Sequence, residues 1–355
     1  MLPQPRVARV TLRATLFAFV LSLCVSSPAA PIKDWSAPAD AEGSALLLSA
    51  HRQITAYHDG HALPEAERPR LRVVYFHPSD REPLADYAAR LDRILTDISE
   101  FYRDGLRRFG MPSDGLPLER KDGRLVIHLV RGKRPASSYT YESGNVTKAE
   151  VGEALKGTVD LDREFVLILY GLFHKDDKGR HVFNAPYYGD GWSDQDHGLC
   201  HAADGEWLDA PLLSDTKRSL TFIEHYYLNG LTMSVAKFNS WYIGGIAHEL
   251  GHGLGLPHDA GQAAEARFGT SLMGTGNHHY RSNLWGGSAP AYLSRTTALQ
   301  LLSHPLVTGS NRDRREWPEL AFDEVAFGAR GQALQITGRT AGKIPTYAVA
   351  AYVIA

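Results

Sequence analysis

The stretch His248–His258 places three histidines, one glutamate and Gly255 in the order H-E-x-x-H-x-x-G-x-x-H. Residues four apart lie on the same face of an α-helix, so His248 and His252 can direct two ring nitrogens to one metal ion. Neutral imidazole is a good zinc ligand, and three protein ligands with one open position are the arrangement of a catalytic zinc site. The spacing therefore predicts a zinc ion that activates a water molecule.

The remaining residues of the stretch fit the same site. Glu249 is rotated by about 100° from His248 on a helix, so it lies beside the open position as a general base and does not join the ligands. Gly255 follows His252 by one turn, and glycine readily adopts the positive φ that ends helices. Pro257 prevents the helix from resuming. The chain can then turn back and present His258 as the third ligand.

This extended motif resembles the signature of the metzincin zinc endopeptidases, here in a bacterial secreted type of chain. Asp259, directly after the third histidine, resembles the adamalysin (reprolysin) branch. The resemblance implies a methionine turn beneath the metal, and Met273 in Ser271–Gly274 stands 15 residues after His258. Met273 is expected to form an apolar floor under the imidazoles without binding the metal. Asp259 is expected to orient the turn or a ligand by hydrogen bonding, although an ordinary surface aspartate is the alternative.

Tyr280 is a further candidate from the same resemblance. Astacins and serralysins place a tyrosine soon after the methionine, where it reaches the metal or the oxyanion. Tyr280 follows Met273 by seven residues, a longer spacing than in those families. We therefore expect Tyr280 to stabilise the transition state, and the neighbouring His278 and His279 to lie at the rim of the cleft.

The resemblance implies an α+β fold, a metzincin-like zincin catalytic domain with a twisted mixed sheet, a long backing helix, an active-site helix, the Met-turn and a C-terminal helix. Hydrophobic periodicity is compatible with this order of elements. It predicts strands at Leu71–Phe76, Arg124–Val130 and Glu164–Tyr170, and helices at Ala85–Phe109, Val151–Leu155, Ile243–Leu254 and Ala291–Ser303. Either Phe165–Tyr170 or a later segment could be the edge strand that pairs with an extended substrate.

The N-terminus has the pattern of a signal peptide. Three arginines precede the apolar run Ala14–Val25, and small residues follow it. We expect residues 1–30 to be the signal peptide, 31–68 a linker or pro-segment, 69–312 the metzincin-like catalytic domain and 313–355 a short β-rich C-terminal segment of three or four strands. The mature protein is then secreted or periplasmic, without a transmembrane segment.

Composition excludes some classes of partner. The chain is 43% hydrophobic and 22% charged with a formal net charge of −2, which is ordinary for a globular protein. It has no basic stripe, so nucleic acid is not an expected partner. Cys24 lies in the signal peptide, which leaves Cys200 without a disulfide partner. Nothing in the sequence indicates the oligomeric state.

Residues Asn184–Leu213 are expected to form an irregular polar loop. Its carboxylates suit a calcium ion, although a solvated surface loop is the alternative. His197, Cys200 and His201 could also bind a second zinc or act as a latency switch, but three ligands are too few for a structural zinc site. The candidate calcium ligands are Asp190, Asp194, Asp196, Asp204 and Asp209.

Together these features predict a secreted zinc-dependent endopeptidase that hydrolyses a protein or peptide substrate with a zinc-activated water and Glu249 as general base. One alternative is a zinc hydrolase of a non-protein amide such as a cell-wall peptide, which would use the same residues. A second alternative is a non-catalytic binding protein on a metzincin scaffold. The presence of Glu249 argues against that alternative, because binding alone does not need this carboxylate.

Overall fold

The computed structural model describes residues 62–111, 113–191, 197–224, 228–309, 321–330 and 333–342, with Ser49, Arg52, Ala56 and Val349 as isolated positions. The predicted signal peptide and most of the predicted linker or pro-segment lie outside the described residues. Within those residues, no helix is long and apolar enough to cross a membrane.

The core of the fold is a mixed five-stranded sheet in the order β4-β1-β5-β9-β8. Its first four strands are parallel, and β8 at one edge runs antiparallel to β9. β5 is buried along its whole length, as expected for a central parallel strand with both faces covered. The strands are β1 Leu71–His77, β4 Ile127–Arg131, β5 Phe165–Tyr170, β8 Tyr188–Gly191 and β9 Gly198–Ala203.

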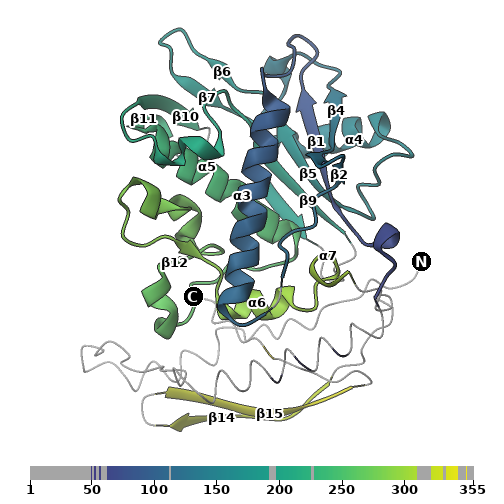
Figure 1. Cartoon of the computed structure of the whole chain (residues 1–355), viewed down its shortest axis with the longest axis vertical. Coiled ribbons are helices and arrows are strands. Elements are labelled where there is room, and N and C mark those ends of the chain that lie inside the picture. The colour runs from purple at the N-terminus through teal and green to yellow at the C-terminus, as the bar shows by residue number, and fades with distance from the viewer. Residues whose placement is uncertain are drawn as a thin grey trace.

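Two long helices pack together beside this sheet (Figure 1). α3 (Tyr87–Arg108) buries an apolar stripe at helical spacing, and α5 (Val235–Gly253) crosses behind it in this view. The Tyr102 hydroxyl of α3 donates to the Ala247 carbonyl of α5 at 2.8 Å. α5 begins at its N-cap Ser234, whose side chain accepts from the Lys237 N–H. The two helices therefore fix the position of the segment that carries the histidine motif.

Smaller elements complete the described chain. A four-stranded sheet has the order β11-β10-β7-β6. β2 and β3 form a short antiparallel pair, and β12 and β13 form a short parallel pair. The helices are α4 Gly144–Ala154, α6 Arg295–Leu301 and α7 Pro305–Thr308, with the 3-10 turns η1 Glu65–Glu67, η2 Ala136–Ser138, η3 Tyr141–Ser143, η4 Ala210–Ser214, η5 Ala263–Phe268, η6 Thr275–His279 and η7 Ser282–Trp285. The strands are β2 Arg120–Lys121, β3 Arg124–Leu125, β6 His174–Lys175, β7 His181–Phe183, β10 Ser219–Glu224, β11 Leu228–Ser234, β12 Thr270–Ser271 and β13 Ala291–Tyr292.

The region expected to be an irregular loop contains two strands of the central sheet, so that expectation was wrong. All six residues of β9 are buried, including His201, which accepts or donates a 2.6 Å hydrogen bond with the Tyr170 hydroxyl. β4 and β8 are the two edge strands of this sheet, whereas Phe165–Tyr170 lies in its middle. Short strands of small and polar residues between loops lack the period that identifies a strand in sequence.

Three predicted helices also differ from the structure. The helix expected at Val151–Leu155 is α4, which starts seven residues earlier, at Gly144. α5 starts eight residues before the expected Ile243, because its first half is buried on most sides and shows no polar face. The predicted helix Ala291–Ser303 is divided into β13 and α6, and Ser294 caps α6 by accepting from the Thr297 N–H. The other expected strands and the long helix lie within a few residues of β1, β4, β5 and α3.

The described part of the C-terminal region is a two-stranded antiparallel hairpin. β14 spans Ala321–Arg330 and β15 spans Ala333–Ala341. Three or four strands were expected there, and residues 343–348 and 350–355 lie outside the described residues.

Candidate metal centre

The three motif histidines converge on one point. The Nε2 atoms of His248 and His252 on α5 are 3.1 Å apart, and the Nε2 atom of His258 lies 3.2 Å and 3.0 Å from them. A point about 2.0–2.1 Å from all three nitrogens, the usual zinc–nitrogen distance, exists just off their common plane. Among the described residues, these three form the group of His, Cys, Asp or Glu side chains close enough to hold a metal ion.

A tight turn brings His258 back to the helix. Gly255 has a φ of 77°, and its N–H donates to the His252 carbonyl at 2.8 Å. The next N–H, that of Leu256, donates to the Gly251 carbonyl at 3.0 Å. These bonds close the end of α5 in the way expected for a left-handed glycine cap. The prediction that Gly255 reverses the chain agrees with this geometry.

Backbone carbonyls orient two of the rings. Nδ1 of His248 is 2.6 Å from the Leu272 carbonyl oxygen, and Nδ1 of His252 is 2.9 Å from that of Leu256. A carbonyl only accepts, so each Nδ1 carries the proton and each Nε2 keeps its lone pair for a metal. Burial lowers the pKa of His248 to about 4 and also lowers that of His252. Both rings are therefore held in the neutral form that a metal requires.

Met273 lies beneath the ligand-bearing turn of α5. Its side chain is buried, and a Cβ atom added at Gly251 would lie 2.3 Å from the Met273 sulfur. Gly251 immediately precedes His252, so only a residue without a side chain lets the thioether pack this closely. The Gly274 N–H donates to the Ser271 carbonyl at 3.0 Å, which forms the turn around the methionine. The structure thus packs Met273 against the turn of α5 that carries His252.

Asp259 connects the turn after α5 to the Met-turn and to α6. Its carboxylate accepts from the Ser271 hydroxyl, from the Ser294 hydroxyl at 2.5 Å and from the Thr297 hydroxyl at 2.9 Å. Its backbone N–H donates to the Met273 carbonyl at 3.1 Å. These partners come from two different segments, Ser271–Gly274 and the start of α6, so Asp259 fixes the position of the neighbouring His258. The alternative of an ordinary surface aspartate does not agree with these contacts.

Glu249 is held beside the histidines by the edge strand. Its Oε2 accepts from the backbone N–H of Gly189 in β8 at 2.7 Å. Burial raises the pKa of Glu249 to about 7, and the Gly189 N–H opposes this rise. A Cβ atom at Gly189 would lie 2.0 Å from the Glu249 carbonyl oxygen, so glycine is required where β8 crosses α5. Nothing in the sequence pattern around Gly189 indicated this contact.

Tyr280 is not part of the metal centre in this structure, which corrects the sequence prediction. Its side chain is completely buried, and its hydroxyl donates to Asp97 of α3. Arg281 pairs with the same carboxylate at 3.2 Å. His278 is exposed and stacks on Trp241 of α5 with ring centroids 4.3 Å apart, which agrees with a position at the rim. The longer spacing after Met273 therefore directs Tyr280 into the core.

The two predicted calcium ligands whose side chains the structure describes are each engaged by an arginine. Asp204 is buried and accepts two hydrogen bonds of 2.8 Å from Arg90, while Asp209 pairs with Arg93 at 2.6 Å. Both carboxylates neutralise arginines, so nothing in the described residues supports the expected calcium site. Asp194 and Asp196 lie outside the described residues, as does the side chain of Asp190.

The described residues also give no support for a second zinc site or a latency switch formed by His197, Cys200 and His201. Cys200 is completely buried, and burial raises the pKa of its thiol well above the usual value. His201 is committed to Tyr170 through its Nδ1. Neither side chain belongs to the group that could hold a metal among the described residues, and the same holds for His197.

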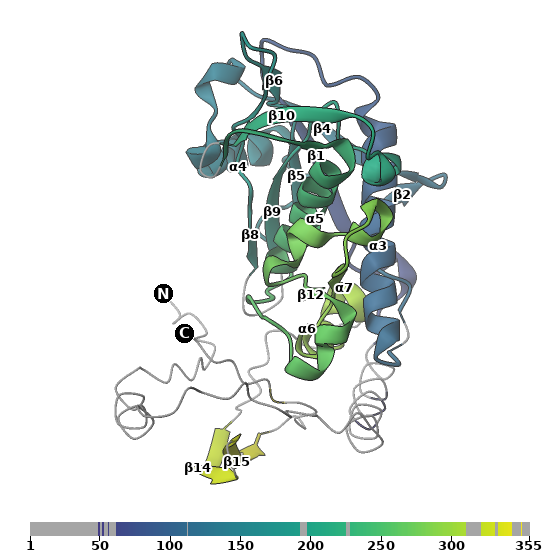
Figure 2. The same ribbon diagram turned by 90° about the vertical axis from the view of Figure 1, so that its left-hand side faces the viewer.

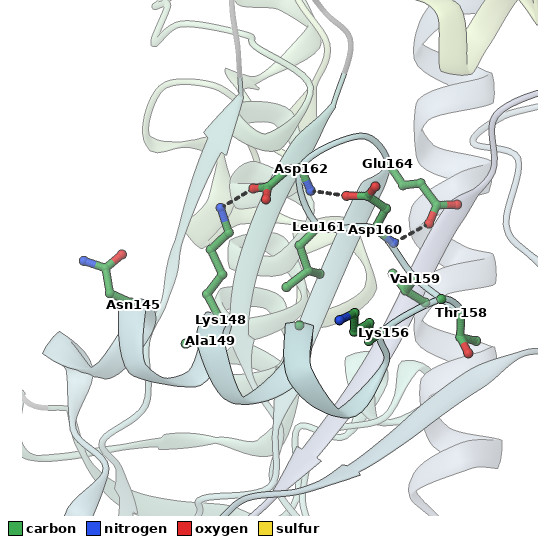
Figure 3. A pocket seen from close by; sticks show the side chains of 12 residues that line it. Asn145, Lys148, Ala149, Lys156, Thr158, Val159, Asp160, Leu161, Asp162 and Glu164 are labelled. Carbon is green, nitrogen blue, oxygen red and sulfur yellow. Dashed lines mark hydrogen bonds and ion pairs between the residues drawn. The ribbon is translucent and has the colours of Figure 1, made fainter.

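A separate surface hollow of about 710 Å³ lies between α4 and the loop that leads into β5 (Figure 3). The Lys148 ammonium crosses it to reach Asp162 at 2.9 Å, and Asp160 and Glu164 bond to backbone N–H groups of the same loop. The hollow contains none of the residues of the metal centre. Four of its charged side chains, Lys148, Asp160, Asp162 and Glu164, already have partners, so we assign it no role.

Comparison with known proteins gives a likeness in three dimensions. No protein-family model and no curated protein matches the chain. Crystal structures of OgpA from Akkermansia muciniphila do match it. A catalytically inactive form of OgpA, in complex with an O-glycopeptide (glycodrosocin) substrate, has a TM-score of 0.59 and 27% identity, covering 78% of this chain and 72% of that chain.

Two crystal forms of wild-type OgpA agree with that match. They have TM-scores of 0.58 and 0.59 and identities of 27% and 26%, and they cover 78% of this chain and 72% and 75% of theirs. This likeness supports a metallopeptidase-like fold for the chain. It does not identify the adamalysin branch, which Asp259 suggested in the sequence.

Proposed function

We propose that this chain is a secreted zinc-dependent endopeptidase of the metzincin type. The observation that carries the proposal is the convergence of three Nε2 atoms within 3.0–3.2 Å, with the Glu249 carboxylate beside them but outside the ligand set. The likeness to OgpA, which was crystallised in complex with an O-glycopeptide substrate, supports a peptide substrate. The proposed signal peptide, residues 1–30, supports secretion, and the catalytic domain is proposed to span residues 69–312.

The residues divide the chemistry between them. His248, His252 and His258 would hold the zinc ion, which when bound supplies Lewis-acid polarisation of the scissile carbonyl and a more acidic water. Glu249 takes a proton from the attacking water as general base and then returns it to the nitrogen of the leaving amine. Asp259 and the Leu272 carbonyl keep the ligand rings in position. Each of these roles falls on an atom whose position is described above.

An O-glycosylated peptide is the first substrate class to test. OgpA takes such a substrate, and this chain covers 72% of the OgpA chain at 27% identity. An unglycosylated twin of the same peptide separates a general endopeptidase from one that needs the sugar. Cell-wall peptide remains the second candidate, because the same zinc and glutamate would hydrolyse any amide that fits the cleft.

The experiment uses purified chain with its zinc content measured. Cleavage of a glycosylated peptide, its unglycosylated twin, casein and peptidoglycan is followed by mass spectrometry, with and without a chelator. We expect peptide-bond cleavage that a chelator abolishes and added zinc restores. Cleavage of peptidoglycan alone would favour the second candidate, and chelator-insensitive cleavage or no cleavage of any substrate would contradict the proposal.

A further inference from the structure

Gly189 lies on the outer edge of β8, next to the candidate metal centre. Its N–H donates to Oε2 of Glu249 at 2.7 Å, and β8 pairs on its other side with β9 through Gly189 and Cys200. In an antiparallel pair, the N–H and C=O of one residue both point toward the neighbouring strand or both away from it. Since the N–H reaches Glu249, the carbonyl of Gly189 also faces away from β9.

These two groups are what an extended peptide needs at a sheet edge. A peptide that adds to an edge strand exchanges backbone N–H and C=O bonds with alternate residues of that strand. Figure 2 shows β8 beside β9, with α5 next to both. A Cβ atom at Gly189 would lie 2.8 Å from the Cβ of His252, so this edge runs directly past a metal ligand. A substrate that reaches the metal along β8 therefore meets the Gly189 N–H.

The same N–H cannot fully satisfy two acceptors. The Glu249 carboxylate accepts from this N–H, and a substrate carbonyl that pairs with β8 needs the same hydrogen atom. The Tyr187 carbonyl, two residues before Gly189, also has a side-chain partner, because the Tyr141 hydroxyl donates to it at 3.2 Å. Competition for the Gly189 donor thus follows from the position of β8.

We propose that the Gly189 N–H serves two partners in turn. In the free protein it holds the Glu249 carboxylate, and when an extended peptide pairs with β8 a substrate carbonyl takes this N–H and releases Glu249 toward the attacking water. This inference rests on the proposed peptidase function and adds a positioning role for the backbone of residue 189. The base then becomes available only after the substrate has paired with the edge strand.

The first test replaces the amide at this position with an ester. Gly189→glycolic acid removes the N–H and adds no side chain, and Gly123→glycolic acid in the β2–β3 turn, where nothing lies within 4 Å, is the control. We expect unchanged zinc content, a KM raised about five- to tenfold by the lost substrate hydrogen bond, and a kcat that does not fall. A fall in kcat at constant KM would mean that the Gly189 N–H holds Glu249 throughout the reaction. No change in kcat or KM would mean that this N–H has no role. Either result overturns the proposal.

The second test does not depend on turnover. In the full chain labelled with ¹⁵N-glycine, we expect the Gly189 amide proton to move upfield in Glu249→Ala and to move back downfield when an uncleaved peptide binds that variant. The Gly179 amide, in a distant turn, serves as the internal reference. An unchanged Gly189 signal in either step contradicts the proposal. A wild-type protein that cleaves no peptide would instead contradict the proposed function, while the response to Glu249→Ala still tests the bond.

Discussion

Nδ1 of His248 and the carbonyl of Leu272 are joined by a hydrogen bond of 2.6 Å. The bond connects the helix that carries two candidate ligands to the segment that carries Met273, so the ring is oriented before any metal binds. Such partners typically change metal affinity by about 10- to 100-fold when they are lost. The candidate metal centre is therefore formed by α5, which precedes the turn at Gly255, and by the segment around Met273, which follows it.

Removal of a ligand should remove the metal. We expect His252→Ala to lose zinc and activity together, with zinc affinity reduced more than about a hundredfold, because two imidazoles cannot complete the site. Zinc content is measured by mass spectrometry after dialysis. His128→Ala, which removes a histidine paired with Glu119, should retain its zinc. Equal zinc in His252→Ala and wild type would exclude this ligand set.

Loss of the base should leave the metal in place. We expect Glu249→Gln to keep a full complement of zinc while kcat falls by about 10²- to 10⁴-fold, since the residue moves a proton and does not bind the ion. Zinc content and single-turnover cleavage are measured on the same preparation. An active Glu249→Gln protein, or one without zinc, is inconsistent with the assigned role.

Asp259 should matter for both stability and metal affinity. Asp259→Ala leaves the hydroxyls of Ser294 and Thr297 without their acceptor, which should cost about 1–3 kcal/mol of unfolding free energy for each buried group left unpaired. Zinc affinity should fall by about 10- to 100-fold. Denaturant unfolding and zinc titration measure the two effects. Asp177→Ala, at an exposed position, is the control, and an Asp259→Ala protein that matches it in both assays would refute the prediction.

The contact between Gly251 and Met273 gives a steric prediction. In Gly251→Ala the new Cβ lies 2.3 Å from the thioether sulfur, so we expect a loss of about 1–3 kcal/mol in unfolding free energy. Gly152→Ala in α4 meets only Leu161 at 3.6 Å and should be neutral or stabilising, because alanine is the better helix former. Thermal unfolding compares the two. If Gly251→Ala is as stable as Gly152→Ala, the packing of the Met-turn is not as described.

Buried His201 predicts a loss of stability in acid. Burial lowers its folded-state pKa to about 4, whereas an unfolded histidine titrates near 6.5. As the pH falls, the unfolded chain therefore binds a proton before the folded chain does. The contribution of His201 to the free energy of unfolding is complete above pH ~6.5 and is lost as the pH falls toward ~4, by up to about 3 kcal/mol. Urea unfolding between pH 7 and pH 4 measures it. His201→Gln should reduce the slope of this part of the profile, of which buried His248 keeps a share, and an unaltered slope would show that His201 does not contribute.

Local patterns predicted much of the site because its chemistry is local. The spacing of His248, His252 and His258 and the turn at Gly255 lie within one short segment, so the helix period and the glycine conformation were enough. The long helix α3 was equally clear from its apolar stripe. In each case the information is contained in a few consecutive turns of chain.

Contacts between distant segments were not predictable in the same way. β9 was missed because it is short and contains His201, whose polarity is satisfied only by Tyr170 on a neighbouring strand. Tyr280 was misplaced because its partner, Asp97, lies 183 residues earlier in the chain. The bond between Gly189 and Glu249 likewise depends on how β8 crosses α5. Such pairings are determined by the packing of the whole domain.

The crossing of β8 and α5 has a practical meaning for protein engineering. At Gly189 and Gly198 an added methyl group would fall 2.0 Å and 1.7 Å from main-chain oxygens of Glu249 and Gly253. Randomised codons at these two positions would yield mostly misfolded clones. A library of variants is better placed at His278, which is exposed and stacks on the half-buried Trp241.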